Sequence, residues 1–245
     1  MPKFHFRSPV QIFRMRSVSE AFRCGQVITK NVSGIDFSWL ITNPGDEIQA
    51  EQIRQGLYES EWIFKVIEVV KQANCVVDVG ANVANHSIAF SKTLRPEKII
   101  MIEPSSTAVS RLLANCSLNP SAAYDFRYMN YGAASKELTV DIVPPSKFNL
   151  GMTKLKKSNS GSIKCLPVDS MVGGATVDLV KIDVEGMEHE ALIGLSRTVE
   201  RDHPAIVAEI ADSNFQECET FLLGYGYRQV LKDENYHGMA NYVFI

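Results

Sequence analysis

Acidic and amide side chains follow directly after two apolar segments, where they could bind a small ligand. The first segment leads into Asp78-Val79-Gly80-Ala81-Asn82, and Asn85 and His86 come next. Glycine lets the backbone turn sharply and approach a ligand, and the helix expected after this turn presents free N–H groups. The second segment ends in Glu103, 23 positions after Gly80, where a carboxylate is the expected acceptor for ribose hydroxyls. Together the two turns predict a nucleoside site, although Glu103 by itself could be an ordinary solvated acid.

The first turn does not carry the dinucleotide fingerprint G-x-G-x-x-G. Asn82 and Asn85 stand where its second and third glycines would be. Close packing of a pyrophosphate against bare backbone is therefore disfavoured, and a nucleoside ligand without a diphosphate fits better. Ribose binding without a diphosphate points to S-adenosylmethionine as the cofactor.

A third group of acids follows a later apolar segment. Asp183 and Glu185 alternate with apolar neighbours, which places both on one face, over the expected cleft. Two carboxylates there could balance a sulfonium cation, accept a proton from a hydroxyl, or bind a metal. Glu209, at the end of the next expected strand, could add a third. The alternative is that these carboxylates only cap helices, as Glu188 does if it lies at a helix N-terminus.

Proton removal from a hydroxyl needs a base, and three residues are candidates. His86 has an unperturbed pKa of about 6.5, close to neutrality. A histidine in the first turn of a helix is often only a hydrogen-bonded wall residue. Asp183 and Glu185 are equally good candidates, so the identity of the base stays open.

Strands and helices that could position these residues alternate along most of the chain. The expected strands span 35–41, 75–79, 98–103, 124–131, 138–143, 177–182 and 205–210. The expected helices span 62–70, 83–94, 108–116, 187–199 and 215–223. Segments 225–231 and 241–245 are typical of a closing antiparallel pair. This alternation is typical of β-α-β units around a parallel sheet and predicts a Rossmann-like α/β domain.

Composition excludes several other classes of protein. Hydrophobic residues make up 45% of the chain and charged residues 22%, as in soluble globular proteins and unlike disordered or fibrous ones. The net charge of −3 gives no global signature of nucleic-acid binding. The five cysteines form no C-x-x-C pair, so neither a zinc ribbon nor a thioredoxin-like redox motif is present. Their odd number and even scatter predict reduced thiols and a cytoplasmic location. No apolar run approaches the length of a membrane-spanning helix.

One segment has a charge opposite to that of the whole chain. Between Ile142 and Val168 there are five lysines and no acid. Its prolines, glycines and serines predict a loop or lid. The positive charge could recruit an anionic acceptor such as a phosphate-bearing sugar or glycolipid, or the segment could be a solvated flexible loop.

Three stretches of sequence carry a resemblance to a known family. The stretch 77–88, the Ile102-Glu103-Pro104 strand end and the stretch 179–188 together resemble the FkbM family of S-adenosylmethionine-dependent methyltransferases. The stretches 56–59 and 241–244 also resemble landmarks of that family. The resemblance covers residues 46–245 and implies one domain with a seven-stranded class I methyltransferase fold. The preceding residues 1–45 are an N-terminal extension of unassigned role.

The resemblance also implies an activity and roles for individual residues. The activity is methyl transfer, usually to oxygen, on acceptors that are often sugars or natural products. Asp78, Gly80, Ala81 and Asn82 would form the loop under the methionine part of the cofactor, with Asn85 and His86 beside it. Glu103 would bind the ribose, while Pro104, Ser105 and the segment 130–133, including Ala133, would shape the adenine side. Asp183 would lie near the transferred methyl.

Other hypotheses remain beside an O-methyltransferase acting on a sugar, glycolipid or natural product. A nicotinamide-dependent oxidoreductase would use the same kind of sheet, and a catalytically silent binding module would keep the fold. Asp183, Glu185 and Glu209 could supply oxygen ligands for magnesium or calcium, but similar acids serve metal-free methyltransferases, so no metal site is predicted. The sequence does not indicate the oligomeric state.

Overall fold

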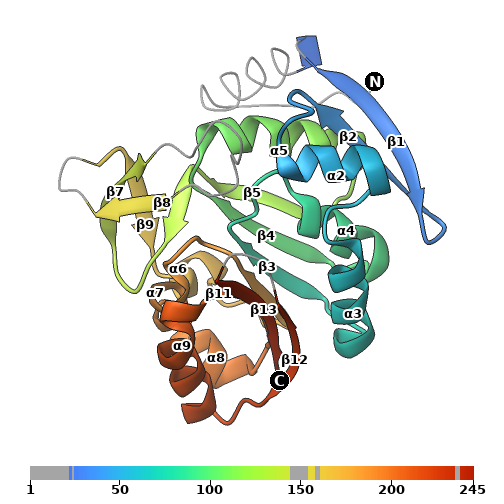
Figure 1. Ribbon diagram of the computed structural model, residues 1–245. Coiled ribbons are helices and arrows are strands. Elements are labelled where there is room, and N and C mark those ends of the chain that lie inside the picture. The colour runs from blue at the N-terminus through green and yellow to red at the C-terminus, as the bar shows by residue number, and fades with distance from the viewer. Residues whose placement is uncertain (1–21, 24, 144–153, 158–160, 235–237) are drawn as a thin grey trace.

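A seven-stranded sheet runs through the middle of the protein (Figure 1). The structure is a computed structural model and describes residues 22–23, 25–143, 154–157, 161–234 and 238–245. The strands, in spatial order, are β12 (Gln229–Glu234), β13 (Met239–Phe244), β11 (Ala205–Ala211), β10 (Leu179–Ile182), β3 (Cys75–Val79), β4 (Lys98–Glu103) and β5 (Tyr124–Met129). β13 runs antiparallel to the other six strands, which all run in one direction. The predicted Rossmann-like fold with an antiparallel C-terminal strand is confirmed.

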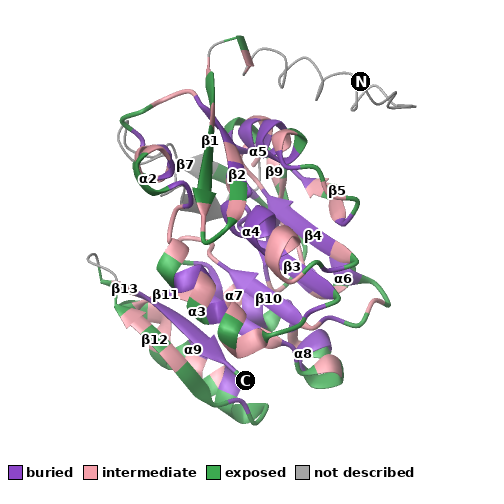
Figure 2. Cartoon of the chain, turned by 90° about the vertical axis from the view of Figure 1, so that its right-hand side faces the viewer, coloured by how far each residue is buried: buried purple, intermediate pink, exposed green. Residues whose placement is uncertain are grey.

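The central strands are apolar because helices cover both of their faces. All residues of β3 and β10 are buried, as continuous hydrophobic runs in parallel sheets normally are. Alternate residues of each strand enter two separate cores: Val77 and Val79 pack on one face, whereas Val76 packs on the other. Figure 2 shows this buried band through the sheet.

Each core is closed by its own group of helices. On the face of Val76 lie α3 (Ser60–Val70), α4 (Asn85–Thr93) and α5 (Ser106–Leu118). On the opposite face lie α6 (Val168–Val172), α7 (Glu188–Ile193), α8 (Ser196–Asp202) and α9 (Asp212–Gly224). None of the helices that the structure describes is both long and apolar enough to cross a membrane.

The segment before the sheet is more ordered than the sequence indicates. A hairpin of β1 (Gln26–Val32) and β2 (Ile35–Ile41) precedes the helix α2 (Glu47–Gln55). The helix has clear end signals, since the Asp46 side chain accepts from the backbone N–H of Gln49, and Gly56 ends it with a φ of 92°. The sequence predicts β2 but neither β1 nor α2.

The hairpin packs into the same core as the large sheet. Phe37 and Trp39 of β2 are fully buried beside the residues of α3, α4 and α5. Asn115 of α5 accepts a hydrogen bond from the Leu40 backbone N–H (2.9 Å) and donates to the Val83 carbonyl (3.0 Å). Residues 26–41 therefore share a core with the domain that follows them.

We expect Asn115→Ala to destabilise the whole domain, because it leaves the Leu40 N–H and the Val83 carbonyl buried without a partner. Each such group costs about 1–3 kcal/mol. The free energy of unfolding, measured by urea titration, should fall accordingly. Ser117→Ala, on the exposed side of the same helix, should change it by less than about 0.5 kcal/mol. An unchanged midpoint in Asn115→Ala would show that the hairpin is not coupled to the core.

Beside the large sheet lies a smaller one of four strands (Figure 1). Its order is β6 (Tyr131–Ala133), β9 (Ile163–Leu166), β7 (Leu138–Val143) and β8 (Lys154–Lys157). The expected strand 124–131 is thus wrong as one element: Asn130, with a φ of 67°, separates β5 from β6, and the chain changes sheets there. The basic segment is likewise not a loop throughout, because 154–157 and 163–166 are strands. Residues 144–153 and 158–160 lie outside the described part of the chain.

The single helix expected over 187–199 is also wrong. Two short helices, α7 and α8, replace it and meet near Gly194. A Cβ at Gly194 would lie 2.2 Å from the carbonyl oxygen of Ala134, so the backbone approaches the end of β6 closely at that point. The apolar pattern continues through the break because both helices cover the same core.

Candidate functional site

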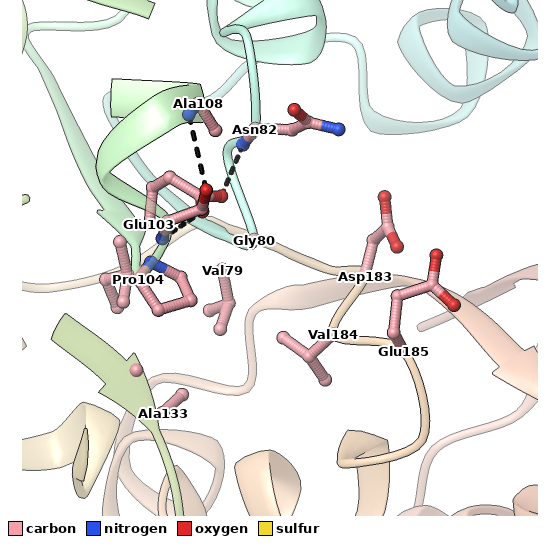
Figure 3. A pocket seen from close by; sticks show the side chains of 13 residues that line it. Val79, Gly80, Asn82, Glu103, Pro104, Ala108, Ala133, Asp183, Val184 and Glu185 are labelled. Atoms are coloured by element: carbon pink, nitrogen blue, oxygen red, sulfur yellow. Dashed lines mark hydrogen bonds between the residues drawn. The ribbon is translucent and has the colours of Figure 1, made fainter. Parts of the chain in front are cut away.

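A pocket lies at the carboxyl ends of the parallel strands, where the strand order reverses between β3 and β10. Ligands of open α/β sheets bind at this position. The pocket has an empty volume of about 580 Å³, and Figure 3 shows Glu103 on one side of it and Asp183 and Glu185 on the other. Its walls come from four segments that follow β3, β4, β5 and β10. The lining residues are Val79, Gly80, Asn82, Ile102, Glu103, Pro104, Ser105, Ala108, Gly132, Ala133, Asp183, Val184 and Glu185.

The turn after β3 forms the floor between these two sides. Gly80 has a φ of 81°, and a Cβ placed on it would lie 1.7 Å from the carbonyl oxygen of Asp183. Only glycine fits there, since the backbones that leave β3 and β10 nearly touch. The backbone N–H of Gly80 donates to the Ile102 carbonyl (2.9 Å), which ties the turn to β4 as well. Three strand ends are therefore fixed relative to one another.

Glu103 is held by the backbone at the end of β4. One carboxylate oxygen accepts from the N–H of Asn82 (2.8 Å) and the other from the N–H of Ser105 (2.7 Å). Ser105 also caps α5 by accepting from the N–H of Ala108 (3.3 Å). Burial raises the pKa of Glu103 to about 7, although these two backbone hydrogen bonds lower it. A carboxylate oxygen can accept more than one hydrogen bond, so Glu103 retains acceptor capacity toward the pocket.

Lys181 joins the acidic groups beneath the pocket. Its ammonium donates to the carbonyl of Gly80 (2.9 Å) and to Asp183 (3.2 Å), and lies 3.4 Å from Asp78. Burial lowers the pKa of Lys181, but the carboxylates of Asp183 and Asp78 outweigh it and raise the pKa overall. Ser87 donates to the second oxygen of Asp78 (2.5 Å). Asp78 therefore forms an ion pair with Lys181 and does not line the pocket.

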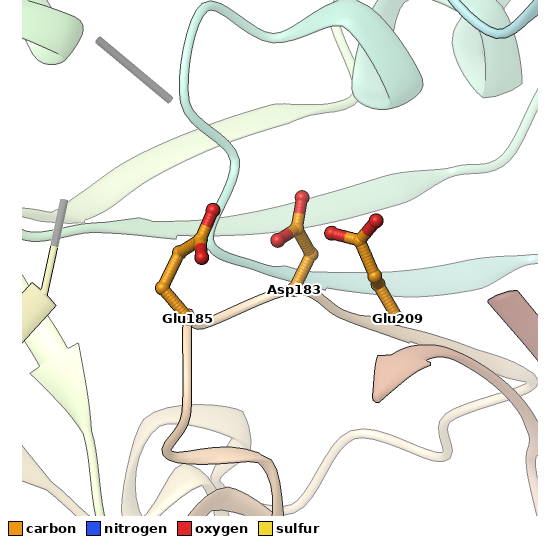
Figure 4. A group of neighbouring side chains, drawn as sticks. All are labelled: Asp183, Glu185 and Glu209. Atoms are coloured by element: carbon orange, nitrogen blue, oxygen red, sulfur yellow. The ribbon is translucent and has the colours of Figure 1, made fainter. Parts of the chain in front are cut away.

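Asp183, Glu185 and Glu209 gather at one end of the pocket (Figure 4). One oxygen of each lies within 4.8 Å of the others, and all three residues are half-buried. Such a group could hold a cation, but exposed acids also gather without one, and Lys181 already supplies a positive charge beside Asp183. Asp183 and Glu185 both line the pocket, as does Val184 between them.

His86 does not line the pocket. It lies next to the carboxylate of Glu59, a residue to which the sequence alone assigns no role. Its Nε2 is 3.5 Å from Oε2 of Glu59, the residue that precedes α3. Burial and the charge of Lys181 lower the pKa of His86 to about 3, so the imidazole is neutral at pH 7. Burial and the charge of Asp183 raise the pKa of Glu59 to about 7.

The structure thus divides the residues that the sequence predicts for the site. Eight of them line the pocket: Gly80, Asn82, Glu103, Pro104, Ser105, Ala133, Asp183 and Glu185. The other four are buried beneath or beside it: Asp78, Ala81, Asn85 and His86. Asn85 accepts from Gln52 (3.3 Å) and donates to the carbonyl of Tyr58 (2.8 Å), which holds the start of α3 against α4.

Two residues of the site have no role in the sequence interpretation. Lys181 interrupts an apolar strand, and a charge within such a buried run is a signal that it is paired. Glu59 lies in the block 56–59 that resembles the family, but nothing in its local sequence indicates which residues it meets.

The chain matches a known protein family. The sequence model of the Methyltransferase FkbM domain matches residues 78–229, more than half of the chain. The hexuronic acid methyltransferase AglP of Haloferax volcanii is 26% identical over 159 residues. The match covers 64% of this chain and 64% of that protein, so the chain spans less than two thirds of its relative.

Two solved structures of methyltransferases are similar to this chain. The methyltransferase FkbM from Methylobacillus flagellatus KT superposes with a TM-score of 0.55 at 18% identity, over 71% of this chain and 44% of that one. A precorrin-6y C5,15-methyltransferase from Geobacter metallireducens GS-15 has a TM-score of 0.48 at 12% identity, over 77% of this chain and 87% of that one. The likeness to the first of these structures shows the fold alone.

Proposed function

The chain belongs to the FkbM methyltransferase family, and on that premise we propose that it transfers a methyl group from S-adenosylmethionine to a sugar hydroxyl. One observation carries the proposal: Glu103 and Asp183 face one pocket from its two sides, across a turn that only glycine can make. The first carboxylate suits a ribose and the second a sulfonium. The acceptor class is supported by the relative that methylates hexuronic acid.

The residues present fit this cofactor. Glu103 keeps acceptor capacity toward the pocket, and its raised pKa shows that the two backbone N–H groups do not fully offset its burial. Two ribose hydroxyls would supply the missing donors. S-adenosylmethionine brings an activated methyl group on a positively charged sulfur. Asp183 would face that charge, while Pro104, Ser105 and Ala133 would bound the adenine.

Asp78, Ala81, Asn85 and His86 would act without touching the cofactor directly. Asp78 would hold Lys181, which in turn fixes the carbonyl of Gly80 and the carboxylate of Asp183. Ala81 is buried in the core behind the turn. A neutral His86 is a weak proton acceptor, since its pKa of about 3 lies well below neutrality. These groups would position the turn that the cofactor contacts.

The acceptor would approach on the side of Asp183, Glu185 and Glu209. An anionic acceptor stays part of the proposal, supported by the basic segment and by the hexuronic acid of the relative. Its negative group would lie away from these carboxylates, because like charges at short range repel. A cytoplasmic location also stays a proposal, supported by the free, buried state of four cysteines, as in a reducing compartment.

The test is titration calorimetry of the purified protein with S-adenosylmethionine, S-adenosylhomocysteine and NAD. We expect both sulfur ligands to bind and NAD not to. Transfer of a radiolabelled methyl group is then measured with glucuronic acid and glucose as acceptors. Absence of binding by either sulfur ligand would overturn the proposal, and tight NAD binding would favour an oxidoreductase.

We expect S-adenosylhomocysteine to bind more tightly as the pH rises through about 7 and then to level off. Glu103 must be ionised to accept from both ribose hydroxyls, and its pKa in the free protein is about 7. Below that pH, binding must first remove a proton, which costs up to about tenfold in affinity per pH unit. Calorimetry between pH 6 and pH 8 measures the effect.

Glu103→Ala should weaken this binding by about 1.5–3 kcal/mol and abolish its pH dependence. Turnover at saturating cofactor should change little, because ribose hydroxyls are remote from the reacting carbon. Glu97→Ala is the matched control, since Glu97 is exposed at the opposite end of β4. If the pH dependence persists in Glu103→Ala, another group binds the ribose.

A further inference from the structure

Glu59 adopts a costly backbone conformation, and its backbone N–H donates to Oε1 of Glu51 on α2 (3.2 Å). It precedes α3 with a φ of 54°, in the left-handed region that favours glycine. Its side chain makes no hydrogen bond that caps this helix. A non-glycine residue kept in such a conformation is a reason to look for a functional role of its side chain.

The side chain of Glu59 points away from its own helix toward the sheet. Oε1 accepts from Nδ2 of Asn241 on β13 (3.4 Å), and Oε2 lies 3.5 Å from Nε2 of His86 on α4. The Glu59 side chain is 20% exposed, so part of it remains accessible. Two elements, α4 and β13, thus contact the carboxylate that the start of α3 carries.

That place lies over the polar ends of the sheet strands. Asn241 pairs in register with Glu209 of β11. Side chains an even number of positions apart in a strand lie on the same face of the sheet. Val243, Val207 and Leu179 belong to the core that α3 and α4 cover. Asn241, Glu209 and Asp183 lie two, two and four positions from them, respectively, and so are on that same face. Glu59 is therefore on the same side of the sheet as Asp183.

The charges that surround Glu59 come from every element packed against it. Lys181 lies within β10, and Asp183 directly follows that strand. Glu51 lies on α2, and the neutral His86 lies on α4. Burial and Asp183 favour the protonated form of Glu59, whereas Lys181 and Asn241 favour the carboxylate. A base works best when its pKa is near the working pH, and among these groups Glu59 meets that condition whereas His86 does not.

We infer that Glu59 is the base that takes the proton from the acceptor hydroxyl, and that His86 and Asn241 are its positioning residues. The inference rests on the proposed function. The acceptor oxygen forms a bond to the methyl carbon while the carbon–sulfur bond breaks. The electron pair of that bond stays on sulfur, which becomes a neutral thioether. The O–H bond breaks, and its proton passes to the carboxylate of Glu59.

This role predicts that the positive charge of the bound methyl donor ionises Glu59. S-adenosylmethionine carries that charge and S-adenosylhomocysteine does not, so the two ligands differ where Glu59 and Asp183 lie. Near pH 7 the wild-type protein should release more protons on binding the first ligand than the second. Calorimetry in buffers of different ionisation enthalpy measures this difference. Proton release from Glu103 is common to both ligands and cancels.

The difference in proton release should vanish in Glu59→Gln and persist in Glu61→Gln, an exposed acid in the first turn of the same helix. Glu59→Gly is a second variant that suits the left-handed backbone, so its melting temperature should equal or exceed that of wild type. With the acceptor sugar found in the transfer assay, both Glu59 variants should lose about 10²-fold or more in turnover. The KM for S-adenosylmethionine should rise by a smaller factor, because an ionised Glu59 and the positive charge of this ligand stabilise each other.

Two further readouts separate a base from a merely structural residue. Wild-type turnover should rise with pH along a limb at or below about 7 that Glu59→Gln lacks, and formate should partly restore Glu59→Gly. Equal proton release in wild type and Glu59→Gln, or turnover of Glu59→Gln equal to that of Glu61→Gln, would overturn the inference while leaving the proposed function intact. Failure of wild type to bind either sulfur ligand would instead remove the proposed function on which it rests.

Discussion

Asp183→Asn should lower the turnover of methyl transfer by about 10²-fold or more at saturating S-adenosylmethionine. The substitution keeps the shape of the side chain but removes the negative charge that would face the sulfonium. Lys181 should stay in place, because the Gly80 carbonyl (2.9 Å) and Asp78 (3.4 Å) still hold it. The fold and the ribose contact should therefore survive, and cofactor affinity should change less than turnover.

Radiolabelled methyl transfer and calorimetry on the same preparation measure the two effects. Asp212→Asn is the matched control, since Asp212 directly follows β11 as Asp183 follows β10, but is exposed outside the pocket. The roles of these two strand ends are assigned wrongly if Asp183→Asn keeps its turnover while Glu103→Ala loses turnover at saturating cofactor.

Gly80→Ala should destabilise the protein and abolish cofactor binding. The new Cβ would lie 1.7 Å from the Asp183 carbonyl oxygen, so the ends of β3 and β10 must separate. The left-handed backbone adds about 1–2 kcal/mol, and forced separation of packed backbone adds typically about 1–3 kcal/mol. Urea unfolding and calorimetry with S-adenosylhomocysteine measure both losses.

Gly173→Ala isolates the steric part of this effect. Gly173 also has a positive φ, of 68°, but a Cβ there would meet no atom within 4 Å. It should cost only the conformational part and leave cofactor binding unchanged. Equal losses in the two variants would mean that the contact between Gly80 and Asp183 does not shape the pocket.

The strands that carry the pocket could be predicted closely from the sequence. The buried runs 75–79 and 98–103 coincide with β3 and β4, because a strand covered on both faces needs a continuous apolar run. The breaks within 187–199 and 124–131 could not be predicted, because the apolar pattern runs through both of them. Gly194 and Asn130 break these two segments where backbone packing and a change of sheet override the apolar pattern.

Part of the site follows from the sequence for a general reason. The carboxyl ends of parallel strands meet at one edge of the sheet, so residues just after each apolar run are brought together. That reasoning predicts Gly80, Glu103, Asp183 and Glu185, all of which line the pocket. It says nothing about side chains that reach the same edge from covering helices.

Only the tertiary structure brings Glu59, His86 and Asn241 together. Glu59 and Asn241 are separated by 182 positions, and their contact depends on how α3 packs over β13. The sequence by itself determined which residue types stand at the strand ends, because local apolar patterns set where strands begin and stop. The tertiary structure decided which groups can move a proton, because burial lowers the pKa of His86 to about 3 and raises that of Glu59 to about 7.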